Sequence, residues 1–175
     1  MAVASLPDGV KLEIRTATRA DLGALTALRQ SVGWSSGGLP GSFGAVEAGR
    51  QIVFLAVSGD RLLGAATLSL QTTGAARRGH ISDVVVSPLW RRRGIGSALL
   101  ETCEETCRQR GLGECTLDVD ATNEAAIALY LGRGYRHHRP AYFPWGPGYT
   151  LRKPLVEEAA RTSRWLWRFW RSGAP

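Results

Sequence analysis

Long apolar segments are absent from this sequence of 175 residues. No run of about 18 apolar residues occurs, and a membrane-spanning helix needs roughly that length. The amino-terminal residues also lack a basic start followed by a continuous apolar stretch, so they predict no signal peptide. We therefore expect a cytoplasmic protein.

Cysteine is scarce, since Cys103, Cys107 and Cys115 are the only three. Their spacing is not that of a metal site, and an odd number without a secretion signal argues against a disulfide framework. Cys103 and Cys107 lie four residues apart on a predicted helix, and Cys115 lies in a predicted strand. This placement favours buried, reduced thiols, and we expect no bound metal ion.

Acidic residues are outnumbered by basic ones. The chain has 22 Lys and Arg against 15 Asp and Glu, which gives a formal net charge of +7. This balance favours a polyanionic ligand, such as one with several phosphate groups. Basic and aromatic residues are not interleaved in the predicted core as they are on a nucleic-acid surface, so we expect no nucleic-acid partner.

The length and the apolar fraction of 44% suit one globular domain. The apolar periodicity predicts strands at 11–15, 51–57, 61–71, 80–86, 114–119, 135–139 and 148–153. Helices are predicted at 19–32, 94–110 and 123–132, and the glycine-rich stretch 33–44 is left without an element. The strand, helix and strand from 80 to 119 form a βαβ unit, whose two strands should run parallel.

The segment 86–100 joins a buried strand to a helix through a basic glycine turn. Pro88 ends the strand, because proline cannot donate to a sheet ladder. Gly94 and Gly96 open the helix, where a ligand can approach the unpaired amides and the positive end of the dipole. Leu99 stands where a dinucleotide fingerprint needs a third glycine, and no P-loop lysine follows. The turn is therefore either a diphosphate site or simply a tight connection.

A second motif begins 27 residues after Gly96, at Asn123, and runs Asn-Glu-Ala-Ala-Ile-Ala-Leu-Tyr to Tyr130, with Gly-Tyr following at 134–135. The first motif reads Val-x-Pro-x-x-Arg-x-x-Gly-x-Gly over 86–96. In this order and spacing, the two motifs resemble those of the GNAT superfamily of N-acetyltransferases. The resemblance extends over about 12–155, from the opening strand and capped first helix to the closing strand.

The resemblance implies a mixed α/β fold, in which a mostly antiparallel sheet contains one splayed parallel pair and carries flanking helices. It implies an acetyltransferase domain, which we place at 1–155, and residues 156–175 are then left as a separate tail. The implied activity is transfer of an acetyl group from acetyl-CoA to a primary amine, directly and in a ternary complex, with no metal. The alternative is a non-catalytic acyl-CoA-binding regulatory module, because fold alone does not separate enzyme from sensor.

Residues of the cofactor site are carried over from the family. The resemblance implies that the pantetheine arm pairs with the backbone of Val84 and Val86 like an added strand. It also implies that the diphosphate lies on the glycine turn and that Asn123 bonds the pantetheine. The predicted cofactor-binding residues are Val84, Val86, Arg91, Arg92, Arg93, Gly94, Ile95, Gly96, Ser97, Asn123 and Tyr130.

Tyr130 is the predicted acid for the departing thiolate. It lies seven residues after Asn123 and so shares its helix face. The resemblance places its hydroxyl at the thioester sulfur, and a phenol with a reference pKa of about 10 stays protonated at neutral pH. The alternative is a core aromatic beside Ile127 and Leu131. The resemblance also implies that the backbone N–H of Val86 donates to the oxyanion.

His80 is the candidate general base. It matches the position at which some family members carry a catalytic glutamate, and histidine titrates in the right range. Strand alternation predicts that it shares a face with Ser82 and Val84, whereas Asp83 would need a bulge to enter the site. The alternative is a solvated residue at a strand edge.

Two tryptophans are candidates for the acceptor side. Trp34 and Trp145 lie in glycine-rich segments that set acceptor specificity in the family. They either clamp the acceptor, a small amine or a peptide amine, or cover the core. No acidic cluster accompanies them, which disfavours polycationic acceptors.

The tail departs from the family pattern. Arginines fall at 161, 164, 168 and 171, and tryptophan, leucine and phenylalanine populate the opposite helical side. Such a segment is typical of an amphipathic helix. It either docks on the domain, mediates a homodimer or contacts a membrane surface.

Overall fold

The computed structural model describes residues 2–6, 9–34, 39–73, 76–144 and 146–155. They form eight strands, namely β1 (Ala2–Ser5), β2 (Lys11–Thr16), β3 (Gln51–Ser58), β4 (Arg61–Thr73), β5 (Ala76–Val86), β6 (Glu114–Asp120), β7 (Arg136–Phe143) and β8 (Gly146–Pro154). These strands make one sheet in the order β1-β2-β3-β4-β5-β6-β8-β7. The predicted tail and Trp145 lie outside the described residues.

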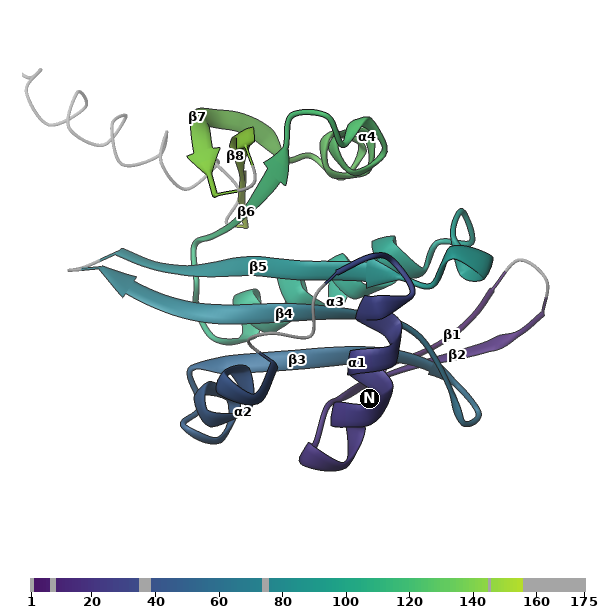
Figure 1. Ribbon diagram of the computed structural model, residues 1–175. Coiled ribbons are helices and arrows are strands. Elements are labelled where there is room, and N and C mark those ends of the chain that lie inside the picture. Colours follow the sequence, from purple (N-terminus) through teal and green to yellow (C-terminus); the bar gives the residue numbers. More distant parts are fainter. Residues whose placement is uncertain (1, 7–8, 35–38, 74–75, 145, 156–175) are drawn as a thin grey trace, which may run out of the picture.

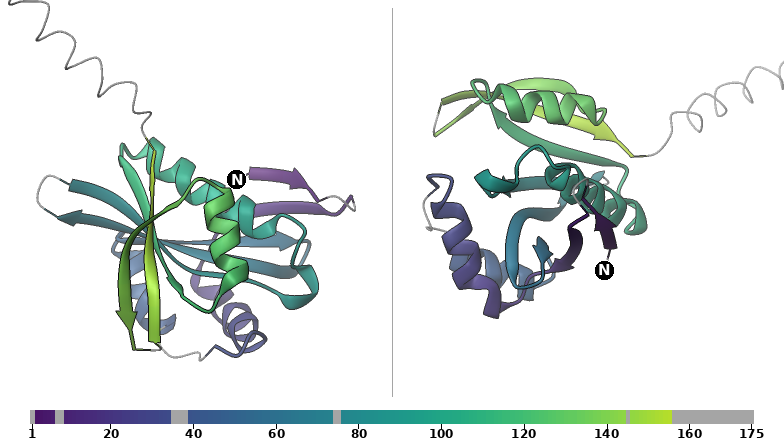
Figure 2. Two further views of the ribbon diagram at one scale, coloured as in Figure 1. Left: turned by 90° about the horizontal axis from the view of Figure 1, so that it is seen from above. Right: turned by 90° about the vertical axis from the view of Figure 1, so that its right-hand side faces the viewer.

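Helices cover both faces of the sheet. They are α1 (Leu22–Gln30), α2 (Leu39–Glu47), α3 (Ile95–Gln109) and α4 (Glu124–Gly132), with short 3-10 turns at Arg19–Asp21 and Pro88–Trp90. Figures 1 and 2 show α1 and α2 on one face of the sheet and α3 on the other. Two apolar clusters correspond to these faces, because Leu28 and Phe43 pack with Leu55, whereas Leu99 packs with Leu68. None of the described helices is long and apolar enough to cross a membrane.

β5 and β6 form the parallel pair, and they soon separate. They pair only at Gly79–Cys115, His80–Thr116 and Ile81–Leu117. Beyond these pairs β5 continues along β4, and β6 continues along β8. Figure 1 shows the two strands diverging, with β6, β7 and β8 standing away from the rest of the sheet. The predicted splayed pair is therefore confirmed.

A bulge lies on β5 just beyond the point of separation. Ser82 pairs with Thr67 and Val85 pairs with Ala65, so two residues of β5 face one of β4. Asp83 adopts a φ of 51° there, a conformation that aspartate tolerates better than most residues. The extra residue reverses the side-chain alternation. Val84 consequently packs against the cluster on the α3 side, and the prediction that it shares a face with His80 is wrong.

Most predicted elements are present, and two were missed. β1 lies before the first predicted strand, and α2 lies in a stretch left without structure because glycines disfavour a helix. Phe43 of α2 is only 2% exposed, and burial of an aromatic side chain offsets that weak helix propensity. The three cysteines are buried and free, as predicted.

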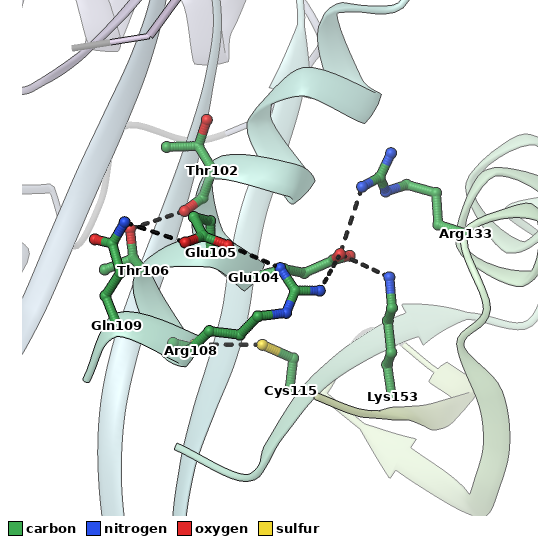
Figure 3. Close-up of polar contacts among 10 residues, drawn as sticks. Thr102, Glu104, Glu105, Thr106, Arg108, Gln109, Cys115, Arg133 and Lys153 are labelled. Atoms are coloured by element: carbon green, nitrogen blue, oxygen red, sulfur yellow. Dashed lines mark hydrogen bonds and ion pairs between the residues drawn. The ribbon is translucent and has the colours of Figure 1, made fainter. Parts of the chain in front are cut away.

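A buried ion cluster joins the two diverging parts. The carboxylate of Glu104, on α3, accepts a hydrogen bond from Lys153 Nζ on β8 at 2.6 Å and lies 3.4 Å from Nη2 of Arg133, which follows α4. Figure 3 shows both cations, together with Arg108, converging on Glu104. Glu104 is 1% exposed, and a buried charge needs such partners. The cluster thus fixes α4 and β8 relative to α3.

Candidate active site

A cavity of about 680 Å³ lies along the end of β5, beyond its last pair with β6. Its wall comprises the end of β5, the start of α3 and one face of α4, so the fold brings the two sequence motifs together. Of the predicted cofactor-binding residues, the lining contains Val84, Val86, Arg91, Arg92, Gly94, Ile95, Gly96, Ser97, Asn123 and Tyr130. Arg93 is not in this lining. Its guanidinium lies over the ring of Trp90, 4.8 Å from the centroid.

The two glycines at the start of α3 have different roles. Gly94 is the N-cap with a φ of 86°, and a Cβ there would meet nothing within 4 Å. It is needed for its backbone conformation, which orients the first amides of α3. Gly96 has ordinary backbone angles, but a Cβ there would lie 3.3 Å from the side chain of Leu129. It therefore allows α4 to approach α3.

Positive charge surrounds this helix start. Arg91 and Arg92 line the cavity, and Arg91 Nε donates to the carbonyl of Val86 at 3.3 Å. Arg92 has a φ of 62°, so the turn contains two left-handed residues, Arg92 and Gly94. Unpaired amides, the helix dipole and these guanidiniums together suit a diphosphate.

The open edge of β5 faces the same cavity. Its residues beyond Ile81 no longer pair with β6, and Val84, Val85 and Val86 line the cavity. A strand edge that has lost its neighbour can bond an extended ligand through its backbone groups. This geometry suits the predicted pairing with a pantetheine arm.

Asn123 begins α4. Its Oδ1 accepts a hydrogen bond from the backbone N–H of Ala126 at 3.1 Å, a standard N-cap contact. The side chain therefore has a structural role in addition to the predicted contact with the ligand. Since Asn123 also lines the cavity, its contact with pantetheine stays a prediction.

Tyr130 is both a core residue and a cavity residue. It is 7% exposed, and its ring meets the ring of Tyr135 edge-on at 6.1 Å. Burial raises the pKa of Tyr130 to about 12. At neutral pH its hydroxyl is therefore a donor, which is the state that protonation of a thiolate requires.

β5 and β6 diverge beyond Ile81 and Leu117, and we call this point the fork. His80 lies beside the fork and is not in the cavity lining. It pairs with Thr116, one residue before the last pair that joins β5 and β6, and its Nδ1 lies 3.1 Å from Thr116 Oγ1. Its Nε2 lies 3.8 Å from a carboxylate oxygen of Asp118. Burial lowers the pKa of His80, Asp118 opposes that shift, and Arg78 adds to it. The imidazole is therefore neutral at pH 7 and able to accept a proton.

Trp34 lies at the cavity, and an ion pair connects it to the bulge. It lines the cavity and is 39% exposed. Arg29 of α1 lies over its ring at 5.3 Å and binds Asp83 Oδ1 through Nη1 at 2.8 Å. This arrangement was not predicted from the sequence. The available signal was a charged residue directly before the apolar run 84–86.

The described residues include no group of three or more His, Cys, Asp and Glu that could hold a metal ion. The groups that the described residues provide at or beside the fork are a buried phenol, an imidazole, backbone amides and a cationic helix start.

Comparison with known proteins places these features in a family. The model of the Acetyltransferase (GNAT) family matches residues 27–135. Over 81 residues the chain is 37% identical to a glucosamine 6-phosphate N-acetyltransferase from Trypanosoma brucei brucei, covering 45% of this chain and 53% of that protein. Over 68 residues it is 38% identical to the ribosomal protein bS18-alanine N-acetyltransferase of Escherichia coli K12, covering 38% and 46%. The chain thus matches about half the length of these relatives.

Solved structures show the same fold. The chain superposes on the Salmonella typhimurium protein yncA, solved with acetyl-CoA, at a TM-score of 0.68 and 18% identity, covering 85% of this chain and 96% of that one. The paia N-acetyltransferase from Thermoplasma acidophilum, in complex with coenzyme A, gives 0.70 and 18%, covering 82% and 98%. Arabidopsis thaliana Naa50, with a bisubstrate analogue, gives 0.70 and 23%, covering 81% and 97%.

Proposed function

This chain belongs to the GNAT family of acetyltransferases, and from that premise we propose that it transfers the acetyl group of acetyl-CoA to a primary amine in a ternary complex. The observation that carries the proposal is that the α3 start, the open edge of β5 and Tyr130 line the same cavity. Each of the three provides one part of the reaction.

The α3 start and β5 hold the co-substrate. The diphosphate of acetyl-CoA lies on the first amides of α3 beside Arg91 and Arg92. The pantetheine arm extends along Val84 and Val86, which directs the thioester into the fork between β5 and β6. Contacts remote from the thioester thus orient it for attack.

The amine nitrogen attacks the thioester carbonyl, and a tetrahedral intermediate forms. We assign the developing oxyanion to the backbone N–H of Val86, a kind of donor whose loss typically costs ~2.7–4 kcal/mol in transition-state stabilisation. When the intermediate collapses, the C–S bond breaks and the electron pair stays on sulfur. Tyr130 then gives its proton to the thiolate, and the surplus proton of the attacking nitrogen passes to the tyrosinate, directly or through water, which leaves a neutral amide.

His80 is our candidate for the base. An alkylammonium has a reference pKa of about 10.4, so the acceptor must lose a proton before it attacks. The neutral imidazole at the edge of the fork accepts that proton, directly or through water. Asp118 then stabilises the resulting imidazolium.

The acceptor is a primary amine of a small molecule or a peptide. The matched relatives are named for glucosamine 6-phosphate and for the alanine of a ribosomal protein, and both acceptors carry a primary amine. Trp34, which lines the cavity, is our candidate for contacting it. The cytoplasmic location, and the contact of the tail with a second copy or a membrane, stay predictions. No observation favours the alternative of a non-catalytic acyl-CoA-binding module.

The proposal is tested by release of free CoA thiol from acetyl-CoA against a panel of sugar amines, polyamines and peptide amines. We expect thiol release that depends on the acceptor, with an acetylated amine as the second product by mass spectrometry. Tight binding of acetyl-CoA without release for any acceptor would overturn the enzymatic assignment and favour the binding module.

A further inference from the structure

A polar surface lies on the sheet face opposite α3, next to the fork. Directly paired residues of neighbouring strands point to the same face, and the register therefore fixes its members. Across β5, β6, β8 and β7, one row contains His80, Thr116, Arg152 and Arg136. The next row, across β6, β8 and β7, contains Asp118, Thr150 and Arg139. The alternate residues Leu117 and Leu151 pack in the cluster on the α3 side. We call these two rows the polar face.

The end of the polar face near the fork is negative. Asp118 Oδ1 accepts a hydrogen bond from Thr150 Oγ1 at 2.8 Å, which fixes the carboxylate. Its Oδ2 points toward His80, and its side chain is 32% exposed. Within the described part of the chain, Asp118 has no ion-pair partner other than His80. A carboxylate beside a neutral imidazole attracts an ammonium group and places it next to the proposed base.

The far end of the polar face is positive. Arg136, Arg139 and Arg152 are all exposed. Arg152 lies 3.4 Å from Glu114, whereas Arg136 and Arg139 form no ion pair with any described residue. Thr150 separates Asp118 from Arg139 in the register, so their backbones lie about 10 Å apart, which is two strand spacings. A guanidinium at that position can bind a carboxylate or a phosphate through two parallel hydrogen bonds.

We infer that the polar face selects an acceptor that carries an anionic group, a carboxylate or a phosphate, in addition to its amine. The inference rests on the proposed function, because it names the substrate class of that transfer. The ammonium lies at Asp118 and His80, and the anionic group lies at Arg139. An amine without an anionic group cannot form the contact with Arg139. A polyamine would bring a second ammonium group next to Arg136, Arg139 and Arg152, which repel it.

Two sources provide this chemistry, namely an amino sugar phosphate and a peptide with an acidic residue near its amino terminus. The test therefore uses two matched pairs of acceptors. One is glucosamine 6-phosphate against glucosamine, and the other is a peptide with Glu at its second residue against the same peptide with Gln. The full chain is assayed with acetyl-CoA as wild type, as Arg139→Gln and as the control Arg110→Gln, an exposed arginine at the end of α3.

We expect wild type to prefer the anionic member of at least one pair by about tenfold in kcat/KM, or ~1.4 kcal/mol. The preference should lie in KM and should fall as salt is added, because exposed charges are screened. Arg139→Gln should lose most of it, whereas Arg110→Gln should keep it. A preference in the phosphate pair alone, or in the peptide pair alone, identifies the source. Equal kcat/KM within both pairs would overturn the inference.

Binding without turnover separates this inference from the proposed function. Calorimetry of glucosamine 6-phosphate and of glucosamine with the CoA complex reports on the polar face even where no thiol is released. Tighter binding of the phosphate, lost in Arg139→Gln, supports the inference independently of catalysis. Equal affinity of the two sugars in this measurement, with no preference in the peptide pair, contradicts it. Absence of thiol release with every acceptor contradicts the proposed function instead.

Discussion

Arg29 and Asp83 form an ion pair, with Nη1 of Arg29 at 2.8 Å from Oδ1 of Asp83. The pair links α1 to the bulge on β5, and the same guanidinium lies over the ring of Trp34. Asp83 also has a φ of 51°. Asp83 thus combines a backbone role, at the bulge of β5, with an ion pair to the arginine that covers Trp34.

The backbone role predicts a difference between two substitutions at this site. Asparagine tolerates a positive φ, whereas valine does not, and a strained backbone of this kind costs about 1–3 kcal/mol. Asp83→Asn should therefore unfold close to the wild-type urea midpoint, which is lowered only by the loss of the ion pair with Arg29. Asp83→Val should unfold at clearly lower urea. Equal midpoints for the two variants would show that the bulge has no requirement for aspartate or asparagine.

Tyr130→Phe should lower kcat with little change in acetyl-CoA affinity. The substitution removes the hydroxyl that protonates the thiolate and keeps the ring that packs on Tyr135. General acid catalysis typically contributes ~10²–10⁴-fold, and we expect a loss in that range. Steady-state kinetics give kcat, and calorimetry gives the dissociation constant of acetyl-CoA. A parallel loss in both would mean that Tyr130 serves packing alone.

The pH dependence of kcat/KM tests His80. The base works when neutral, so activity should rise through the pKa of His80, and burial sets that pKa below its usual value of 6.5. Asp118→Asn removes the carboxylate that raises this pKa, and the acid limb should then move to lower pH. Arg78 and Thr116 also face His80 and stay unchanged.

His80→Gln should abolish this limb, whereas His138→Gln, an exposed histidine on β7, should keep it. An unchanged acid limb in His80→Gln would assign the proton to water or to another group.

Gly94 provides a test of the α3 start that separates binding from stability. Gly94→Ala introduces a side chain at a φ of 86° and disturbs the amides that we assign to the diphosphate. Gly59→Ala is a matched control, because Gly59 also has a positive φ of 55° and open space around it, but lies in the β3–β4 turn. Both variants should lose about 1 kcal/mol of stability. Only Gly94→Ala should weaken acetyl-CoA binding, by about tenfold or more, as measured by calorimetry.

The order of elements and the meeting of the two motifs were predictable from the sequence. Apolar periodicity marks α3 and β6, and Gly94 with Asn123 marks the two helix starts that share the cavity. These signals are local, since they depend on neighbours within one or two turns of the chain. The family resemblance assigned Asn123 only to the ligand, although the structure shows that its oxygen also caps α4.

The features that failed prediction depend on contacts between distant segments. The bulge at Asp83 reverses the face of Val84, and strict alternation from His80 cannot show it. The row from Asp118 to Arg139 exists only once β6, β8 and β7 are in register. Tertiary packing of Phe43 likewise stabilises a helix that its glycines disfavour.

Glu104 provides the last prediction, because its buried carboxylate joins α3 to β8 and to the end of α4 (Figure 3). Glu104→Gln keeps the shape of the side chain but removes its negative charge, so Lys153 and Arg133 lose this ion-pair partner. Breaking a buried ion pair by changing one partner costs about 3–5 kcal/mol in the free energy of unfolding. Lys153→Met should also destabilise the protein. The double variant should lose less than the sum, by about 0.5–3 kcal/mol, because the two side chains are in contact.

Glu47→Gln is the control for this cycle, because Glu47 pairs with Arg19 on the surface. An exposed ion pair contributes little to stability because water and salt screen it, so this variant should unfold close to wild type in urea. If Glu104→Gln cost no more than Glu47→Gln, the cluster would not hold the diverging parts together. The position of α4, and with it of Tyr130, would then depend on apolar packing alone.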